Sequence, residues 1–424
     1  MVIFKYQLVS LRKVLKQNKM IIEFKFKNFT SYKDETVLSL TTVKSFKELK
    51  RTNVIPNANQ NFDLLKSAAI FGSNGGGKSN FIEAITFMKD VFHNSFSESL
   101  KKEEERGRKD YYFKLNTASE KKPTFFEVSF IVDNLIYRYG FEILGFEIIS
   151  EWLYKKNEVE TPLFKRNGQD FETINKSNFQ DGLKFKDSVN SNVLFVSHLA
   201  QNNSKDVKPI RDFFMDLNVL SGLDDKTPKE VTKLLYNISP EFKKWLSLAV
   251  RFLEITKVGI TKEDELVTYH NKFDENNFIV DSIPFKLDED ESQGTKKIVF
   301  LLGAIYDTLT KGKVLFIDEL DSKLHPNLTK KLLDLFQKFN RNNAQFIFTS
   351  HDANLLSKEI LRRDQIWFVD RNKFGASELY SLSDFDASVV RSTSDFRKKY
   401  LENSFGAAET INITDDIINL MYGK

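Results

Sequence analysis

The stretch GSNGGGKS, residues 72–79, decides the fold. It matches the pattern G-x-x-x-x-G-K-[ST], follows an apolar strand ending at Phe71 and precedes an amphipathic helix. Glycines let backbone N–H groups converge on phosphate oxygens, and a helix N-terminus adds partial positive charge. This context predicts a phosphate-binding loop rather than a glycine-rich turn, and therefore a nucleotide-binding α/β protein.

The loop also predicts the ligands and the residues that hold them. Lys78 would reach the β- and γ-phosphates, and the Ser79 hydroxyl would coordinate Mg²⁺. We therefore expect ATP and Mg²⁺ as cofactors. The predicted nucleotide-binding residues of the loop are Gly72, Asn74, Gly75, Gly76, Gly77, Lys78, Ser79 and Asn80.

A second apolar strand, KVLFIDEL (313–320), ends in two acids. Its apolar residues place Asp318 and Glu319 at the carboxyl edge of a parallel sheet, where α/β proteins bind ligands. Asp318 would hold the Mg²⁺ shell, and Glu319 would polarise the attacking water. The alternative is a pair of ordinary strand-end acids. Beside a phosphate loop, the two acids predict hydrolysis as well as binding.

The next strand, FIFTSHD (346–352), ends in a histidine. We expect His351 to donate to the γ-phosphate and to sense whether it is present. The alternative is a structural histidine. The other four histidines show no metal-ligand spacing, so the sequence predicts no zinc site.

Composition narrows the class of protein. The chain has 424 residues, no cysteine and a net charge of +4. Without residues 1–19, which carry five basic residues and no acid, 58 basic and 59 acidic residues remain, a net of −1. The body therefore gives no overall electrostatic case for nucleic-acid binding. Residues 1–19 are either an upstream extension, with Met20 as the natural start, or a basic arm for membrane or nucleic acid.

The lack of cysteine excludes disulfides and thiolate metal sites and fits a cytoplasmic location. No apolar run reaches the roughly 18 residues of a membrane span.

Periodicity predicts an α/β core with insertions. A hairpin is predicted around the turn Asp133-Asn134. Helical segments are expected at 206–254, 294–310, 326–340 and 353–361. Strands are expected at 20–29, 36–43, 66–71, 124–165, 191–203, 255–286, 313–320, 344–350 and 364–372, before a polar tail.

These motifs together resemble the ABC-type ATPase heads of the structural-maintenance-of-chromosomes (SMC), RecF and OLD group. A closer resemblance is to the AAA-family ATPases of bacterial phage-defence (abortive infection) systems, the AbiL/RloA type. The matching stretches are ESQGTKK (291–297), DELDSKLHP (318–326) and YLENSFGA (400–407). The resemblance covers about residues 20–407. It implies an ABC-ATPase head, a P-loop NTPase, with a β-rich lobe, a helical insertion and no long coiled coil.

The resemblance also divides the chain into segments. Residues 20–95 would form the N-terminal part of the ATPase core with the phosphate loop, after the extension 1–19. Residues 96–290 would form the β-rich lobe and helical insertion. Residues 291–424 would complete the core with the signature motif, the acidic strand and the histidine loop.

In such heads a signature motif, usually LSGGQ, starts a helix and completes the ATP site of a partner subunit. Ser292 and Gly294 match its serine and second glycine, which implies that both contact ATP in trans. Gln293 stands where glycine is usual, and the four acids 288–291 would repel phosphate. These departures make the motif an imperfect phosphate ligand.

Two further family positions are less clearly matched. Gln201 is the candidate for the Q-loop glutamine, which joins the Mg²⁺ and water network. His325 stands where the family has a D-loop aspartate, seven residues after Asp318. The family's D-loop mechanism therefore does not transfer directly.

The resemblance implies an ATP-hydrolysing switch in a phage-defence complex, working as at least a homodimer that controls a separately encoded effector such as a Toprim-type nuclease. The 73 residues after His351 are too few for a Toprim domain, so no nuclease is expected in this chain. One alternative is a RecF/SMC-like DNA-repair clamp, which would bind nucleic acid. Another is a nucleotide-binding scaffold with negligible turnover.

Overall fold

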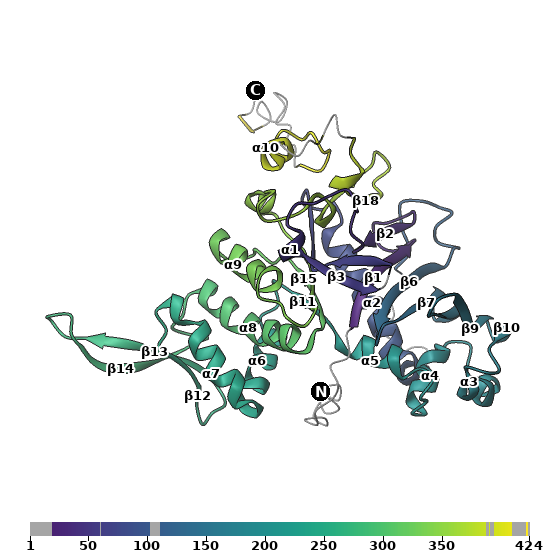
Figure 1. The fold of residues 1–424 in the computed structure, drawn as a ribbon, viewed down its shortest axis with the longest axis horizontal. Coiled ribbons are helices and arrows are strands. Elements are labelled where there is room, and N and C mark those ends of the chain that lie inside the picture. Colours follow the sequence, from purple (N-terminus) through teal and green to yellow (C-terminus); the bar gives the residue numbers. More distant parts are fainter. Residues whose placement is uncertain are drawn as a thin grey trace.

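The computed structural model describes residues 19–59, 61–101, 111–386, 390, 394–408 and 421–422. Residues 1–18 of the predicted extension lie outside this part. The fold is mixed α/β, as predicted, with a six-stranded and a seven-stranded sheet (Figure 1).

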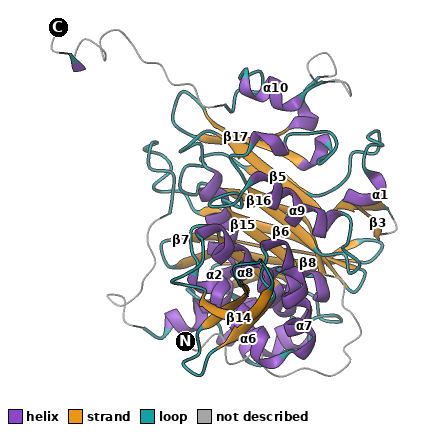
Figure 2. Ribbon diagram, turned by 90° about the vertical axis from the view of Figure 1, so that its left-hand side faces the viewer, coloured by secondary structure: helices purple, strands orange, loops and turns teal. Residues whose placement is uncertain are grey.

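The six-stranded sheet holds the strands that carry the predicted motifs. Its order is β11-β15-β16-β5-β17-β18, and all pairs are parallel except β17 with β18. Figure 2 shows β17, β5, β16 and β15 side by side in this order. The strands are β5 (Ser67–Gly72), β11 (Leu217–Ser221), β15 (Val314–Asp318), β16 (Gln345–Thr349), β17 (Ile366–Arg371) and β18 (Ser377–Ser381).

Two hydrophobic cores cover the two faces of this sheet. In β5, Ala68 and Ile70 face one core, and Ala69 and Phe71 face the other. Successive side chains of a strand point to opposite faces, so a strand buried on both faces reads as an unbroken apolar run. The first core includes helix α2 (Lys78–Ser99), and the second includes α8 (Gln293–Lys311) and α9 (Pro326–Gln337).

The seven-stranded sheet is antiparallel, with order β10-β9-β8-β7-β6-β1-β2. Asp133 and Asn134, with φ of 52° and 66°, connect β6 and β7, which confirms the predicted hairpin. The strands are β1 (Lys19–Lys27), β2 (Thr36–Ser39), β6 (Thr124–Val132), β7 (Leu135–Leu144), β8 (Glu147–Lys156), β9 (Glu160–Asn167) and β10 (Asp170–Ile174).

Two smaller sheets complete the strands. One pairs β3 (Val54–Asn59) with β4 (Phe62–Leu65) next to helix α1 (Lys50–Asn53). The other contains β12 (Lys257–Ile260), β13 (Leu266–Phe273) and β14 (Ile279–Lys286). In Figure 1 the hairpin of β13 and β14 extends away from the body, at the far left.

The remaining helices are α3 (Gln180–Phe185), α4 (Phe195–Gln201), α5 (Lys208–Asp216), α6 (Lys226–Ile238), α7 (Pro240–Ala249) and α10 (Phe396–Leu401). The longest helix of the described residues is α2, with 22 residues, and that part of the chain contains no long coiled coil. No helix among the described residues combines the length and apolarity needed to cross a bilayer.

Several sequence predictions of local structure are wrong. The strand expected at 191–203 contains helix α4. Buried Glu151 of β8 accepts hydrogen bonds from the backbone N–H groups of Phe195 (2.6 Å) and Val196 (3.1 Å), and it pairs with buried Arg166 at 2.8 Å. A helix start capped from a distant strand leaves no local signal.

Three further predictions also differ from the structure. The helical region 206–254 contains strand β11, which pairs with β15, so the predicted middle segment 96–290 contributes a strand to the core sheet. The helix expected at 353–361 is one 3₁₀ turn, Ala353–Leu355, followed by turns. The polar tail contains β18 and α10, because Tyr400 and Phe405 are buried against Phe368.

Candidate functional site

The phosphate loop lies at the carboxyl end of β5 and leads into α2. Lys78 begins the helix, and its amino group donates to the carbonyls of Gly72 and Ser73, both at 2.9 Å. The Ser79 side chain is exposed on the first turn. Gly75 has open space around it and a φ of 70°. The loop therefore presents a cation, a hydroxyl and a helix N-terminus together, which suits a phosphate group.

Residues from two other segments hold the loop in shape. The Ser377 hydroxyl of β18 donates to the Gly76 carbonyl, and the Tyr32 hydroxyl donates to the Gly77 carbonyl at 3.0 Å. A Cβ atom on Gly77, whose φ is 126°, would lie 2.4 Å from the Ser377 oxygen. The Asn80 side chain donates to the Ser31 hydroxyl at 2.7 Å, so it supports the loop here.

The two predicted acids stand at the same sheet edge, two strands from the loop. Asp318 ends β15, and Glu319 follows it with a φ of 49°. The hydroxyl of buried Thr349, at the end of β16, donates to the Asp318 carboxylate at 2.6 Å and accepts from the Glu319 N–H at 2.7 Å. One side chain thus fixes both acids, and it holds Glu319 in a backbone conformation that few non-glycine residues adopt.

Backbone contacts enclose the acids further. The Gly222 N–H donates to the Asp318 carbonyl at 2.6 Å, and a Cβ atom on Gly222 would lie 2.1 Å from the Glu319 carbonyl oxygen. Lys297 of α8 donates to the carbonyls of Glu319 (3.2 Å) and Ser322. Burial lowers the pKa of Lys297 to about 8. The helix that starts at the predicted signature motif therefore touches the loop that follows Asp318 in its own chain.

His351 follows β16 and is exposed at the same edge. Its backbone N–H donates to the two carboxylate oxygens of Asp321, at 3.1 and 3.3 Å. His325 caps α9, because its Nδ1 accepts from the Asn327 N–H at 3.2 Å.

Ser292 is the N-cap of α8, and its hydroxyl accepts from the Thr295 N–H at 3.1 Å. Ser292 and Gln293 are exposed, and Gly294 is half-buried. Glu291 does not face this helix end, because its carboxylate binds the Thr268 hydroxyl and His270 (2.7 Å) of β13. Asp288 pairs with Lys229 and Glu289 with Lys286, and the Asp290 carboxylate accepts a hydrogen bond from the backbone N–H of Lys286. The expected repulsion of phosphate is thereby reduced.

The structure does not bring Gln201 to the phosphate loop. Gln201 is the last residue of α4, and the Ser197 hydroxyl in that helix donates to the carbonyl of Phe92 in α2. Phe92 is 14 residues after Lys78 along α2, or about 21 Å at the usual helical rise. The position of Gln201 in the sequence suggested a Q-loop, but α4 packs against the half of α2 that is farther from the phosphate loop.

Among the site residues that the sequence predictions did not include are Thr349, Asp321 and Ser377. Thr349 and Asp321 lie within the quoted motifs FIFTSHD and DELDSKLHP, so polar residues flanking the motif positions were the available signal. Ser377 lies in the predicted polar tail and becomes part of the site only because β18 pairs with β17.

One protein family matches more than half of the chain. Residues 67–357 match the family model AAA_21, described as "AAA domain, putative AbiEii toxin, Type IV TA system". No curated protein matches the chain.

Solved structures similar to the chain include the SMC head domain from Thermotoga maritima, with 14% identity, a TM-score of 0.40, and coverage of 87% of this chain and 99% of that one. Another is the SmcHead bound to the C-winged helix domain of ScpA, with 17% identity, a TM-score of 0.46 and the same coverages. A third is the Smc head domain with an extended coiled coil bound to the C-terminal domain of ScpA derived from Pyrococcus furiosus. Its identity is 15%, its TM-score 0.36, and its coverages 86% and 96%.

Proposed function

The chain belongs to the AAA_21 family of AAA domains, and from this membership we propose that it is an ATP-binding and ATP-hydrolysing switch subunit of an anti-phage defence complex. One observation carries the enzymatic part of the proposal. The phosphate loop, Asp318, Glu319 and His351 follow three neighbouring parallel strands and therefore meet at one edge of one sheet. The defence role is supported by the family description, which names an AbiEii toxin.

The proposed chemistry assigns each group one task. Lys78 binds the β- and γ-phosphates, and Glu319 orients and accepts a proton from the attacking water. His351 donates to the γ-phosphate. Ser79 and Asp318 offer the oxygen ligands that Mg²⁺ prefers, and bound Mg²⁺ would neutralise phosphate charge.

The proposed switch is dimerisation of two heads around ATP. Ser292 and Gly294 lie at the start of a 19-residue helix, and their accessibility suits contact with a nucleotide held by a second subunit. The closed dimer would position or release a separately encoded effector, and hydrolysis would reset it.

Glu319→Gln tests the proposal. The variant should bind ATP with wild-type affinity, release no phosphate and accumulate as a closed dimer in size-exclusion chromatography with light scattering. Ser292→Arg is the matched control, since it should bind ATP but form no closed dimer. Undiminished turnover of Glu319→Gln would remove Glu319 from its role. Hydrolysis by the wild-type chain that requires DNA would instead support the clamp alternative.

The shared site can be tested separately. Lys78→Ala and Ser292→Arg should each be inactive alone, and a mixture should recover part of the ATPase activity in mixed dimers. If no activity reappears, completion of the ATP site in trans is refuted.

A further inference from the structure

The hairpin of β13 and β14 ends in an apolar tip. Phe273, Phe278, Ile279 and Val280 are 54%, 69%, 62% and 58% exposed. Soluble proteins rarely leave so many large apolar side chains together in water, unless the surface binds something. Ile279 and Val280 are successive residues of β14, so they point to opposite faces of the hairpin. A flat surface could cover only one face, so the partner must surround the tip.

The tip is ordered by its own turn. The Asp274 carboxylate accepts hydrogen bonds from the N–H groups of Asn276 and Phe278, both at 2.9 Å, and the Asp274 N–H donates to the Phe278 carbonyl at 3.0 Å. A preformed element loses less conformational freedom on binding than a flexible one. Residues 272–281 contain one lysine and three acids, a net charge of −2. A matching socket must therefore offer apolar side chains together with basic ones.

The chain itself has such a socket at the small sheet of β3 and β4. A cavity of about 340 Å³ lies there between the loop before α1 and the β3–β4 hairpin. Its lining includes the apolar residues Val43, Phe46, Val54 and Phe62 and the exposed lysines Lys44, Lys47 and Lys50. Arg362 and one acid, Asp63, also line the cavity, so its lining has a net charge of +3. This charge is opposite in sign to that of the tip.

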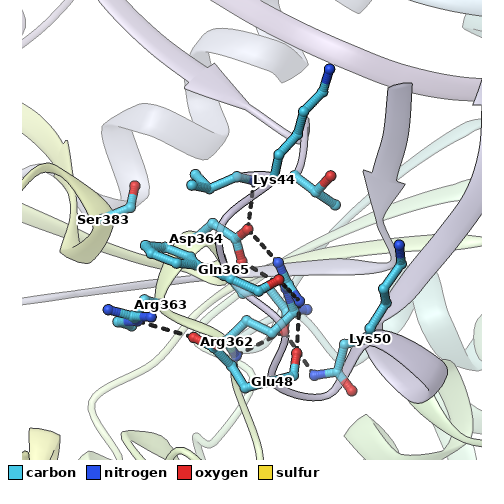
Figure 3. A network of polar contacts seen from close by, with 12 residues as sticks. Lys44, Glu48, Lys50, Arg362, Arg363, Asp364, Gln365 and Ser383 are labelled. Carbon is cyan, nitrogen blue, oxygen red and sulfur yellow. Dashed lines mark hydrogen bonds and ion pairs between the residues drawn. The ribbon is translucent and has the colours of Figure 1, made fainter. Parts of the chain in front are cut away.

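The base of the socket is a rigid polar network (Figure 3). Buried Arg362 makes a two-pronged ion pair with Asp364, at 2.9 and 2.7 Å, and donates to the Glu48 carbonyl at 2.6 Å. Arg363 stacks 3.7 Å from the centre of the Phe46 ring. In Figure 3 the amino groups of Lys44 and Lys50 point away from this network to the same side. The network therefore fixes the socket while leaving the lysines at its rim.

We propose that the tip of the β13–β14 hairpin of one copy, led by Phe278, inserts into the Lys44–Lys47–Lys50 socket of a second copy of this chain. Figure 1 shows the hairpin far from α1 of the same chain, so the contact forms between copies. Each copy keeps a free tip or socket after pairing. Such a head-to-tail contact builds a ring or an open filament, unlike the two-fold contact of a head dimer.

Light scattering on the full chain without nucleotide tests the contact, because head dimerisation then does not contribute. The wild-type chain should form assemblies whose mass rises with protein concentration. The tip variant Phe278→Ser and the socket variant Lys44→Glu/Lys47→Glu should each be monomeric, with wild-type unfolding midpoints and ATP binding. Mixed together, they should form a 1:1 dimer and nothing larger, because only one intact tip and one intact socket remain.

A second experiment reverses the charges of the tip to match the reversed charges of the socket variant. Glu275→Lys/Asp281→Lys should restore assembly to the socket variant, and these changes leave the Asp274 turn intact. A monomeric wild-type chain at every concentration would overturn the proposal, as would tip or socket variants that assemble like the wild type. Loss of assembly in the tip variant alone would also refute it, since the tip would then dock elsewhere.

Discussion

Replacing Thr349 by valine should slow hydrolysis more than it weakens ATP binding. Valine keeps the shape of threonine but lacks the hydroxyl that bonds Asp318 and the Glu319 N–H. Leaving the Glu319 N–H and the Asp318 carboxylate without this partner should lower the free energy of unfolding by about 2–4 kcal/mol. A domain stability of about 5–15 kcal/mol leaves the variant folded.

The catalytic effect follows from the backbone of Glu319. Its positive φ is held by the Thr349 hydroxyl and by Lys297 at the carbonyl. If about 1.4 kcal/mol of positioning is lost, kcat falls roughly tenfold. The affinity for ATP, which depends on Lys78, should stay within about twofold, because a difference of a few tenths of a kcal/mol corresponds to that factor.

Steady-state phosphate release, nucleotide titration and urea unfolding measure these three quantities. Thr349→Ser is the matched control, because it keeps the hydroxyl and loses one methyl group, at about 1 kcal/mol of stability. A valine variant with the wild-type kcat and urea midpoint would show that the Thr349 hydroxyl does not position Glu319. A serine variant that slows hydrolysis as much as the valine variant would show that the methyl group, and not the hydroxyl, is responsible.

Three further predictions follow from other parts of the structure. Lys78→Ala should abolish nucleotide binding in calorimetric titration; normal affinity would contradict the loop assignment. Arg166→Leu should cost about 3–5 kcal/mol in urea unfolding, because it leaves the buried Glu151 without its counter-charge; a change below 1 kcal/mol would show that the capping N–H groups suffice. Burial lowers the pKa of Lys297 to about 8 from 10.5, so between these pH values the unfolded chain binds a proton that the folded chain has lost. The free energy of unfolding of the wild type relative to Lys297→Met should therefore rise from about pH 8 to pH 10.5. A difference that does not change with pH would contradict the burial of the Lys297 amino group.

The sequence predicted best the elements whose signal is local. The loop before α2 and the strand ending at Asp318 each carry their motif and their apolar run in one short stretch, so both fall where expected. Ser292 falls at a helix start for the same reason. In these segments the local pattern and the tertiary structure favour the same conformation.

Elements defined by distant partners could not be read from the sequence. Helix α4 depends on a carboxylate from β8, and β11 is a strand because β15 lies beside it. Thr349 belongs to the site because parallel pairing aligns the ends of β16 and β15. Gln201 is the opposite case. Its place in the sequence suggested a position beside the phosphate loop, but α4 packs against the distant half of α2.

The place of β5 between β16 and β17 has a consequence for synthesis on the ribosome. Both neighbours of this strand are encoded about 270 to 300 residues after it. At about 5–20 residues per second, the finished phosphate-loop strand waits roughly 15–60 s before either neighbour can emerge. During that interval its two edges and the apolar face that packs against α8 and α9 lack their final partners, which favours aggregation. The nascent chain should therefore depend on chaperones until its last quarter has been translated, and a truncation before residue 345 should yield insoluble protein.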